Sequence, residues 1–449
     1  MASIVKRRKK FAVVYTYTDE QGTKRQKWET FDTNAEAKKR KLQVEYEQKM
    51  GVFIMPTAKT LNELLDEYMS IYGVNTWALS TYESKKSLLK NYVRPIIGDM
   101  KLEDINTRMM DQYYKSLLKV KSVVVNNKKP ASEYVTPHTV KEIHKTLRSA
   151  FNQAVKWELI NKNPVIKATL PTEEEVPRNM WNVDTLFKAL EVCEDDNLAL
   201  AMNLAFSCSL RIGELLGLTW DCVDISKESI DSGMAFIYIN KELQRINRDS
   251  LEELGEKGVM LKFPPAVAST HTALVLKKPK TKSSVRKVFL PKTVAEMLVK
   301  RKEEQEEYKQ IFGDEYTDYN LVFAMTNGRP MEGQVINRAF RKLINDNGLP
   351  KVVFHSLRHS SITYKLKLNR GDMKAVQGDS GHAQVKMVAD VYSHIMDDDR
   401  CLNAQKFEEE FYNKEESQKK DMSEEEMLVR KLLENPEMAV ILKALVNNM

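Results

Sequence analysis

A stretch rich in proline and glutamate, LPTEEEVPRN at residues 170–179, divides the chain into two parts with different patterns. Such a stretch is typical of a linker, because proline interrupts regular structure and clustered charges stay solvated. Before it, apolar residues recur every three to four positions; after it, helical patterns alternate with β-branched runs. A chain of 449 residues also exceeds what one core usually spans. We therefore expect several domains, with a linker at 171–179.

The segment 1–56 predicts a small β-sheet with one helix. FAVVYTYT and TKRQKWETF alternate polar and apolar residues on either side of a turn-like DEQG. TNAE, beginning at Thr33, has the spacing of a capping box and opens a lysine-rich helix that runs to about Met50. The segment holds 13 Lys and Arg against 7 Asp and Glu, which favours a polyanionic partner.

Residues 57–170 predict an all-α domain, since four segments carry apolar residues at helical spacing. The fourth begins at Thr136 with a proline in its first turn, and ends before NKNP. One apolar stripe is expected to face the core: Val140, Ile143, Leu147, Phe151 and Ala154. Three basic residues point elsewhere: Lys141, Lys145 and Arg148.

Residues 180–412 predict a mixed α+β domain, with strands at AFIYIN (235–240), TALVL (272–276) and VRKVFL (285–290). The stretch 241–271 is expected to be an irregular surface loop. A charged spacer and an amphipathic helix occupy 413–449. So short a helix needs a surface to dock on, and we expect a neighbouring protomer to provide it.

Several classes of protein are disfavoured. No apolar run reaches the length of a membrane span, and no signal peptide follows the basic N-terminus, so we expect a cytoplasmic protein. The four cysteines lack CxxC spacing, which argues against a disulfide framework and a zinc site. We expect no metal and no cofactor.

Two basic motifs each have an ordinary interpretation and a functional one. In SLRIGELLGLTW, Arg211 and Glu214 lie three residues apart, as a structural ion pair or as an arginine oriented toward a phosphate. In KKPKTKSSVRKVFLP, the lysines predict a solvated turn between two strands, or a turn that brings one lysine to a substrate as proton donor.

Two histidine-containing motifs follow. HSLRH places His355 and Arg358 on one helical face, where they can converge on a small anion; it lacks the glutamate of a HEXXH metal site. SGHAQVKMVADVYSHIMDDD contains His382 and Tyr392. A lone tyrosine is usually a packing residue, because its pKa of about 10 makes it a poor nucleophile without nearby cations.

In combination, R, K, HxxR, H and Y along one chain supply fixed cations, two imidazoles and a nucleophile for a phosphodiester. This order resembles the tyrosine recombinase (integrase) family. The resemblance implies six catalytic residues, Arg211, Lys280, His355, Arg358, His382 and Tyr392, with Glu214 as an acidic neighbour. Departures include Ser380 before the GH and the insertion at 241–271.

The resemblance also implies a function: a site-specific recombinase that integrates or excises a mobile element through a 3′-phosphotyrosyl intermediate, without metal or ATP. It implies an arm-type DNA-binding domain at 1–56, with Lys24, Arg25 and Lys27 on its basic strand, and a core-binding domain at 57–170, with Lys141, Lys145 and Arg148 as DNA contacts. Its partners would be double-stranded DNA with core and arm-type sites, three further copies in a tetramer, and an excision factor or host DNA-bending protein. The expected location is the cytoplasm of a bacterial cell, in association with the nucleoid.

Two other functions use the same observations. A type IB topoisomerase-like nicking-closing enzyme needs the same residues in one protomer. A non-catalytic DNA-binding regulator would be expected to have lost Tyr392 or an arginine, and neither is lost.

Overall fold

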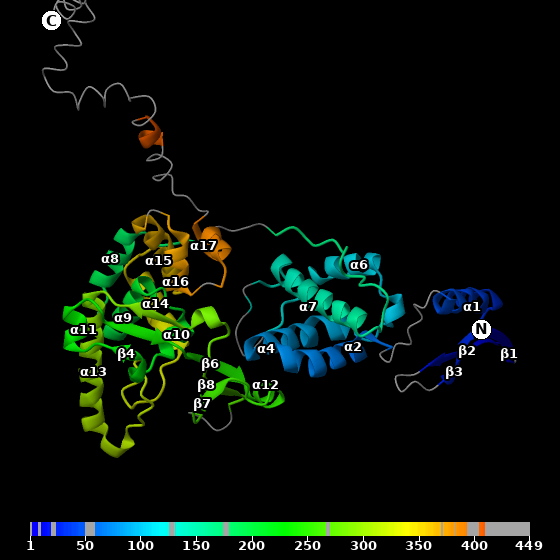
Figure 1. Ribbon diagram of the computed structural model, residues 1–449, viewed down its shortest axis with the longest axis horizontal. Coiled ribbons are helices and arrows are strands. Elements are labelled where there is room, and N and C mark those ends of the chain that lie inside the picture. Colours follow the sequence, from blue (N-terminus) through cyan, green and yellow to red (C-terminus); the bar gives the residue numbers. More distant parts are fainter. Residues whose placement is uncertain are drawn as a thin grey trace, which may run out of the picture.

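In the computed structural model of the protein, three groups of elements follow one another along the chain (Figure 1). The described residues are 2–7, 10–18, 24–49, 59–124, 130, 132–173, 179–265, 270–369, 371–381, 383–392 and 404–408. The predicted tail helix within 413–449 and the middle of the predicted linker lie outside them.

The first group is a three-stranded antiparallel sheet with one helix. It consists of β1 (Ser3–Arg7), β2 (Lys10–Thr18), β3 (Lys24–Phe31) and α1 (Asn34–Lys49), with β2 in the centre of the sheet. Val13 and Tyr15 pack with Ala37 and Val44 between sheet and helix. The predicted capping box is confirmed, because the backbone N–H of Thr33 donates to Glu36 while that of Glu36 donates to Thr33 Oγ1, both at 3.3 Å. Strand β1 was not predicted from the alternation of residues.

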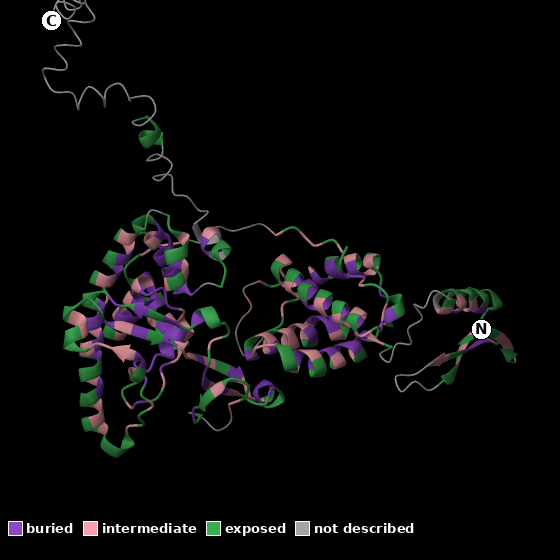
Figure 2. Ribbon diagram, viewed as in Figure 1, coloured by how far each residue is buried: buried purple, intermediate pink, exposed green. Residues whose placement is uncertain are grey.

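The second group is helical, as predicted. Its elements are α2 (Leu61–Glu67), π-helical turns at Tyr68–Gly73 and Leu89–Val93, α3 (Val74–Thr76), α4 (Leu79–Leu88), α5 (Arg94–Ile97), α6 (Thr107–Leu117) and α7 (Pro137–Lys156). Thr136 caps α7, and Pro137 stands in its first turn. The whole predicted apolar stripe of α7 is buried, which confirms the helical period (Figure 2).

The third group contains two antiparallel sheets. One has the order β4 (Val223–Asp224), β5 (Phe236–Ile239), β9 (Arg286–Phe289). The described helices around it are α8 (Val183–Glu191), α9 (Asp196–Ser207), α10 (Ile212–Leu216), α11 (Lys227–Asp231), α13 (Lys292–Phe312), α14 (Gly333–Asp346), α15 (Ser356–Leu368), α16 (Met373–Ser380) and α17 (Val385–Tyr392). None of the helices in the described ranges has both the length and the apolar character needed to cross a bilayer.

The prediction of an irregular loop at 241–271 is wrong. This segment forms β6 (Glu242–Asn247), α12 (Arg248–Glu253) and β7 (Val259–Lys262), which join β8 (Thr272–Lys277) in a second sheet of order β6-β8-β7. The two strands that flank the lysine-rich turn therefore belong to different sheets, so that turn is not a β-hairpin. In ELQRIN the two buried residues, Leu243 and Ile246, are three positions apart, so the sequence lacks the period-2 alternation that indicates a strand.

The second sheet packs against the helical group. Five residues of β6, β8 and the α12 region belong to the same apolar cluster as the helical core: Ile246, Leu251, Leu254, Ala273 and Val275. At the edge of this contact Lys86 Nζ lies 2.6 Å from Glu253 Oε1, and Lys257 Nζ donates to the carbonyl of Asn75 at 2.8 Å. Helices α4 and α12 lie side by side there (Figure 1). The segment 241–271 thus connects the third group of elements to the helical group, which lies far from it in the sequence.

We predict that Leu251→Ala loosens this contact locally. Leu251 is fully buried, and truncating a buried leucine removes packing free energy of about 2–5 kcal/mol. Hydrogen exchange should accelerate in α4 and α12 but not in β5 and β9. Leu298→Ala, an equally buried site in α13, provides the control. Equal acceleration of α4 by both variants would contradict the contact.

Candidate active site

Arg211 and Glu214 form a pair at the start of α10. Arg211 Nη1 lies 2.6 Å from Glu214 Oε1, and the backbone N–H of Arg211 donates to Glu214 Oε2 at 3.1 Å. Glu214 is 1% exposed, whereas the side chain of Arg211 is 33% exposed. The carboxylate is therefore a buried support, and part of the arginine side chain remains accessible to a ligand.

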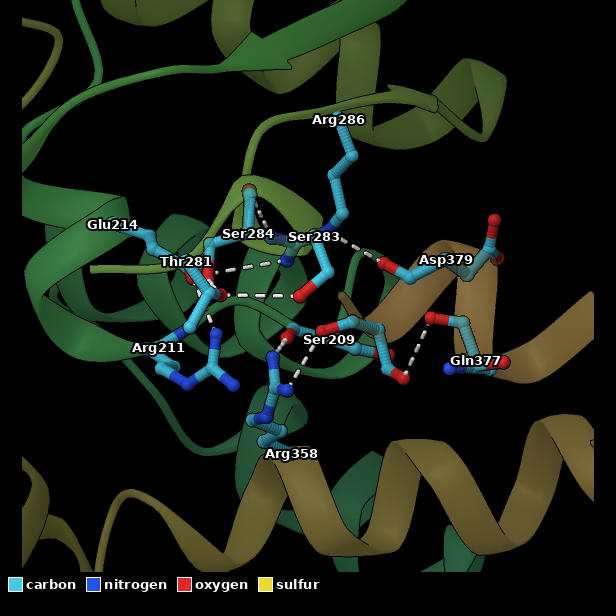
Figure 3. Close-up of polar contacts among 11 residues, drawn as sticks. Ser209, Arg211, Glu214, Thr281, Ser283, Ser284, Arg286, Arg358, Gln377 and Asp379 are labelled. Atoms are coloured by element: carbon cyan, nitrogen blue, oxygen red, sulfur yellow. Dashed lines mark hydrogen bonds and ion pairs between the residues drawn. The ribbon is translucent and has the colours of Figure 1, made fainter. Parts of the chain in front are cut away.

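A second arginine that the sequence interpretation missed also binds this carboxylate. Arg286 of β9 places Nη2 3.1 Å from Glu214 Oε2, and its side chain is 6% exposed (Figure 3). It also donates from Nε to the carbonyl of Asp379 at 2.7 Å and from Nη1 to that of Ser284 at 3.0 Å. The signal in the sequence is its position: in VRKVF, Arg286 shares the inward face of the strand with Val288.

Arg358 lies beneath the same cluster, held by backbone carbonyls. Its Nη1 donates to the carbonyl of Ser209, and its Nη2 to that of Ser380 at 2.7 Å. Ser209 has a φ of 54°, a strained value for a residue other than glycine. Its Oγ lies 2.6 Å from that of Ser361 in the helix that carries Arg358. The strained turn before Arg211 thus presents its carbonyl to the second predicted arginine.

The charges in the cluster shift each other's ionisation. Burial lowers the pKa of Arg358 to about 9, and the nearby charge of Arg211 contributes to this shift. Burial by itself would raise the pKa of Glu214, but the charges and hydrogen bonds of Arg286 and Arg211 outweigh it and hold the pKa below its ordinary value. At neutral pH the guanidinium of Arg358 therefore stays protonated and the carboxylate of Glu214 stays ionised.

The histidines of the HSLRH motif lie at the start of α15, whereas the predicted proton-donor lysine lies in the turn between β8 and β9. His355 is exposed at the N-terminus of α15, one turn before Arg358, and its ring packs edge-on against His359 with centroids 4.8 Å apart. Lys280 is exposed, and its Nζ donates to Thr81 Oγ1 of helix α4 at 3.3 Å. Among the described contacts, Lys280 does not touch the arginine cluster. Lys277 is instead buried in an ion pair with Glu242, at 2.7 Å.

The last two predicted catalytic residues are described only in part. Tyr392 is the final residue of α17, and its side chain is outside the description; His382 lies outside the described residues. Gly381, directly before His382, ends α16 with a φ of 65°. Within the described ranges, no His, Cys, Asp or Glu side chains cluster as a metal site would require.

The predicted DNA contacts lie on two separate surfaces. Lys24 and Arg25 are exposed on β3, and Lys27 on the same strand is half-buried. On α7, Lys141 lies 3.0 Å from Glu173 and Lys145 lies 2.6 Å from Glu142. Arg148 is exposed on the same helix. Exposed ion pairs of this kind are weak, so the lysines can exchange their carboxylates for phosphates.

Comparisons with known proteins find similar sequences and a similar fold. Residues 266–398 match the model of the phage integrase family, and residues 60–118 match that of the phage integrase N-terminal SAM-like domain. A tyrosine recombinase XerC-like protein of Caldanaerobacter subterraneus subsp. tengcongensis is 26% identical over 329 residues, 71% of this chain and 74% of its own. The integrase of Staphylococcus phage L54a is 25% identical over 359 residues, 75% of this chain and 89% of its own.

A solved structure of the Tn1549 transposon integrase, in complex with a circular intermediate DNA, shares the fold. Its TM-score is 0.58 at 17% identity, with 78% of this chain and 100% of the other covered. The fold and the matches define an enzyme that cleaves and rejoins DNA in site-specific recombination. These matches support a tyrosine recombinase of the phage integrase kind.

We predict that Glu214→Gln destabilises the protein by about 3–5 kcal/mol at pH 7, because the guanidiniums of Arg286, which is buried, and Arg211 lose their counter-charge. Because folding lowers the pKa of Glu214 from its ordinary value of 4.5, ionised Glu214 stabilises the fold at pH values above 4.5. This stabilisation is lost as the pH falls through the lower pKa of the folded state. Urea unfolding at pH 7 and pH 4 should show that the free energies of unfolding of wild type and Glu214→Gln differ less at pH 4. Glu332→Gln, in an exposed pair with Arg245, is the control and should cost less than about 1 kcal/mol. A pH-independent difference would contradict the ionised Glu214.

Proposed function

We propose that the protein integrates and excises a mobile genetic element by cutting each DNA strand through a 3′-phosphotyrosyl intermediate. The observation that carries this proposal is one cluster that holds both Arg211, bound to Glu214, and Arg358, bound to the carbonyls of Ser209 and Ser380. A carboxylate and two carbonyls hold the two guanidiniums before any substrate arrives. Cations fixed in advance stabilise a developing anion without reorganisation during the reaction.

The two arginines differ in what they can do to a scissile phosphate. Arg211, one third exposed, would bind a non-bridging oxygen directly through its planar fork. Arg358, almost fully buried, would add positive charge in a medium of low dielectric constant and reach the phosphate once DNA covers the site. Both effects stabilise the negative charge that grows on the non-bridging oxygens in the pentacoordinate transition state.

In the proposed cleavage step, Tyr392 Oη forms a bond to phosphorus while the bond from phosphorus to the 5′-oxygen breaks. The tyrosine proton passes to His355 or His382, and Lys280 donates a proton to the departing 5′-oxygen. The reverse sequence, with the 5′-hydroxyl of another strand as nucleophile, rejoins the DNA. The phosphotyrosyl bond conserves the energy of the broken linkage, so the scheme includes neither ATP nor a metal.

A topoisomerase-like nicking-closing enzyme is the second candidate, since it would need the same six residues. The separate sheet at 2–49 favours recombination, because one protomer that only relaxes DNA has no use for a second DNA-binding module. The similarity to a phage integrase and to a transposon integrase supports the same choice. We propose that the protein acts as a homotetramer on core and arm-type sites, assisted by an excision factor or a DNA-bending protein.

The mechanism predicts a covalent adduct. Purified protein, in EDTA, is mixed with a DNA duplex that spans the junction flanking its gene and carries a nick near the crossover. We expect a protein-DNA band that survives denaturation with wild type and falls at least about 1000-fold with Tyr392→Phe, because the nucleophile is lost. Tyr364→Phe, in α15, is the matched control and should retain the band. A wild type without adduct, or a Tyr392→Phe variant with equal adduct, would contradict the mechanism.

The N-terminal sheet is predicted to bind distal arm-type sites. Deleting residues 1–56 should weaken arm binding and leave cleavage of a core site intact. Replacing Lys24, Arg25 and Lys27 with glutamine should reduce the slope of log affinity against log salt by roughly 0.9 for each phosphate that is no longer neutralised. Replacing Lys38, Lys39 and Lys49 of α1 removes the same charge and is the control. Equal slopes for both triple variants would contradict binding through the strand.

A further inference from the structure

Arg286 lies within KKPKTKSSVRKVFLP, where the sequence analysis assigned it no role, yet it contacts three segments of the site. Its carboxylate partner, Glu214, belongs to α10 and supports Arg211. Its carbonyl partners are Asp379 in α16 and Ser284 in the turn that follows Lys280. Figure 3 shows these groups converging on one guanidinium. Three segments far apart in sequence are thus joined by one side chain.

The geometry at Glu214 makes the two arginines interdependent. Oε1 accepts from Arg211 Nη1 at 2.6 Å, while Oε2 accepts from Arg286 Nη2 at 3.1 Å and from the backbone of Arg211. The carboxylate is therefore held on both oxygens, and its plane is fixed. Without Arg286, the carboxylate would lose one of the two charges that offset its burial and could rotate with Arg211 attached.

The guanidinium of Arg286 also contacts the end of α16, directly before His382. A β-carbon on Gly381 would lie 2.9 Å from Arg286 Nη1 and 3.0 Å from the carbonyl of Ser283, closer than such contacts allow. The φ of 65° at Gly381 is also one that residues with a β-carbon rarely adopt. The absence of a side chain at Gly381 thus lets the backbone at the end of α16 lie close to the guanidinium.

We propose that Arg286 is a positioning residue for DNA cleavage. It sets Arg211 through Glu214, and it holds the end of α16 from which the chain continues to His382. This inference rests on the proposed function, because it assigns a role within that reaction. Lysine at this position would keep the charge but offers a single nitrogen, which cannot reach partners on three segments in the planar arrangement that Arg286 uses.

The alternative is that Arg286 only stabilises the fold. Arg301 of α13 is the matched control, since it is also a buried arginine with comparable partners. It donates to the carbonyls of Val322 and Ala324 and lies 3.4 Å from Glu304, none of which belongs to the proposed site. Its side chain is 5% exposed, against 6% for Arg286. Loss of either arginine should lower the melting temperature, whereas only Arg286 should affect the chemistry.

The test measures the first-order rate of adduct formation at saturating DNA, on the nicked duplex used above and on one with a neutral methylphosphonate at the scissile position. We expect Arg286→Met to slow cleavage of the phosphodiester about 100-fold and Arg286→Lys about 10-fold, as loss of a preorganised donor would. The methylphosphonate has no charged non-bridging oxygen to neutralise, so its cleavage should slow less than about 10-fold. DNA affinity should stay unchanged, and Arg301→Met should stay within about threefold of wild type on both substrates.

The outcomes separate this inference from the proposed function. A wild type that forms no adduct contradicts the proposed function, and the positioning role fails with it. A wild type that forms the adduct while Arg286→Met slows both substrates equally, or while Arg301→Met slows cleavage as much as Arg286→Met, overturns the positioning role alone. A selective loss on the phosphodiester, partly restored in Arg286→Lys, supports it.

Discussion

The site depends on one buried carboxylate. Glu214 is almost fully removed from solvent, and an isolated carboxylate in that position would be protonated or would destabilise the fold. Two guanidiniums and a backbone N–H keep it ionised. Since Arg211 stands at the start of α10 and Arg286 in β9, the carboxylate of Glu214 links this helix to this strand. A third guanidinium, that of Arg358, lies beside them, so the cluster carries three positive charges against one negative charge. Backbone carbonyl oxygens stabilise the excess positive charge by accepting hydrogen bonds from the guanidiniums, and the net charge remains. These carbonyls belong to Ser209, Ser284, Asp379 and Ser380. A site with this balance keeps a net positive charge, which favours an anionic ligand. Backbone carbonyls are suited to this task, because their positions follow from the fold and do not titrate.

Much of the architecture could be predicted from local patterns. The α7 stripe and the TNAE capping box depend on residues within one or two turns of each other, and both are confirmed. The pairing of Arg211 with Glu214 is also local, since the two residues are three apart. These features follow from helix geometry alone, which a periodic sequence records directly.

The remainder depends on contacts between distant residues. Arg286 reaches Glu214 across 72 positions, and Arg358 reaches Ser209 across 149. No local pattern records which carbonyl an arginine will find. The second sheet was missed for the same reason, because its buried face packs on helices that precede it by more than 100 residues. Ser380, which departs from the family pattern, is fully buried and uses its carbonyl to bind Arg358, a role that does not depend on its side chain.

The second sheet explains why the position of Lys280 is coupled to the helical group. Strand β8 buries Ala273 and Val275 in the helical core and runs directly into the turn that carries Lys280. The same turn ends at β9, whose Arg286 is bound to Glu214. The proposed proton donor is therefore held between two anchors, one apolar and one ionic. A shift of the helical group would move the first anchor and leave the second in place, so in the proposed mechanism the reach of Lys280 toward the phosphate would depend on the position of the helical group.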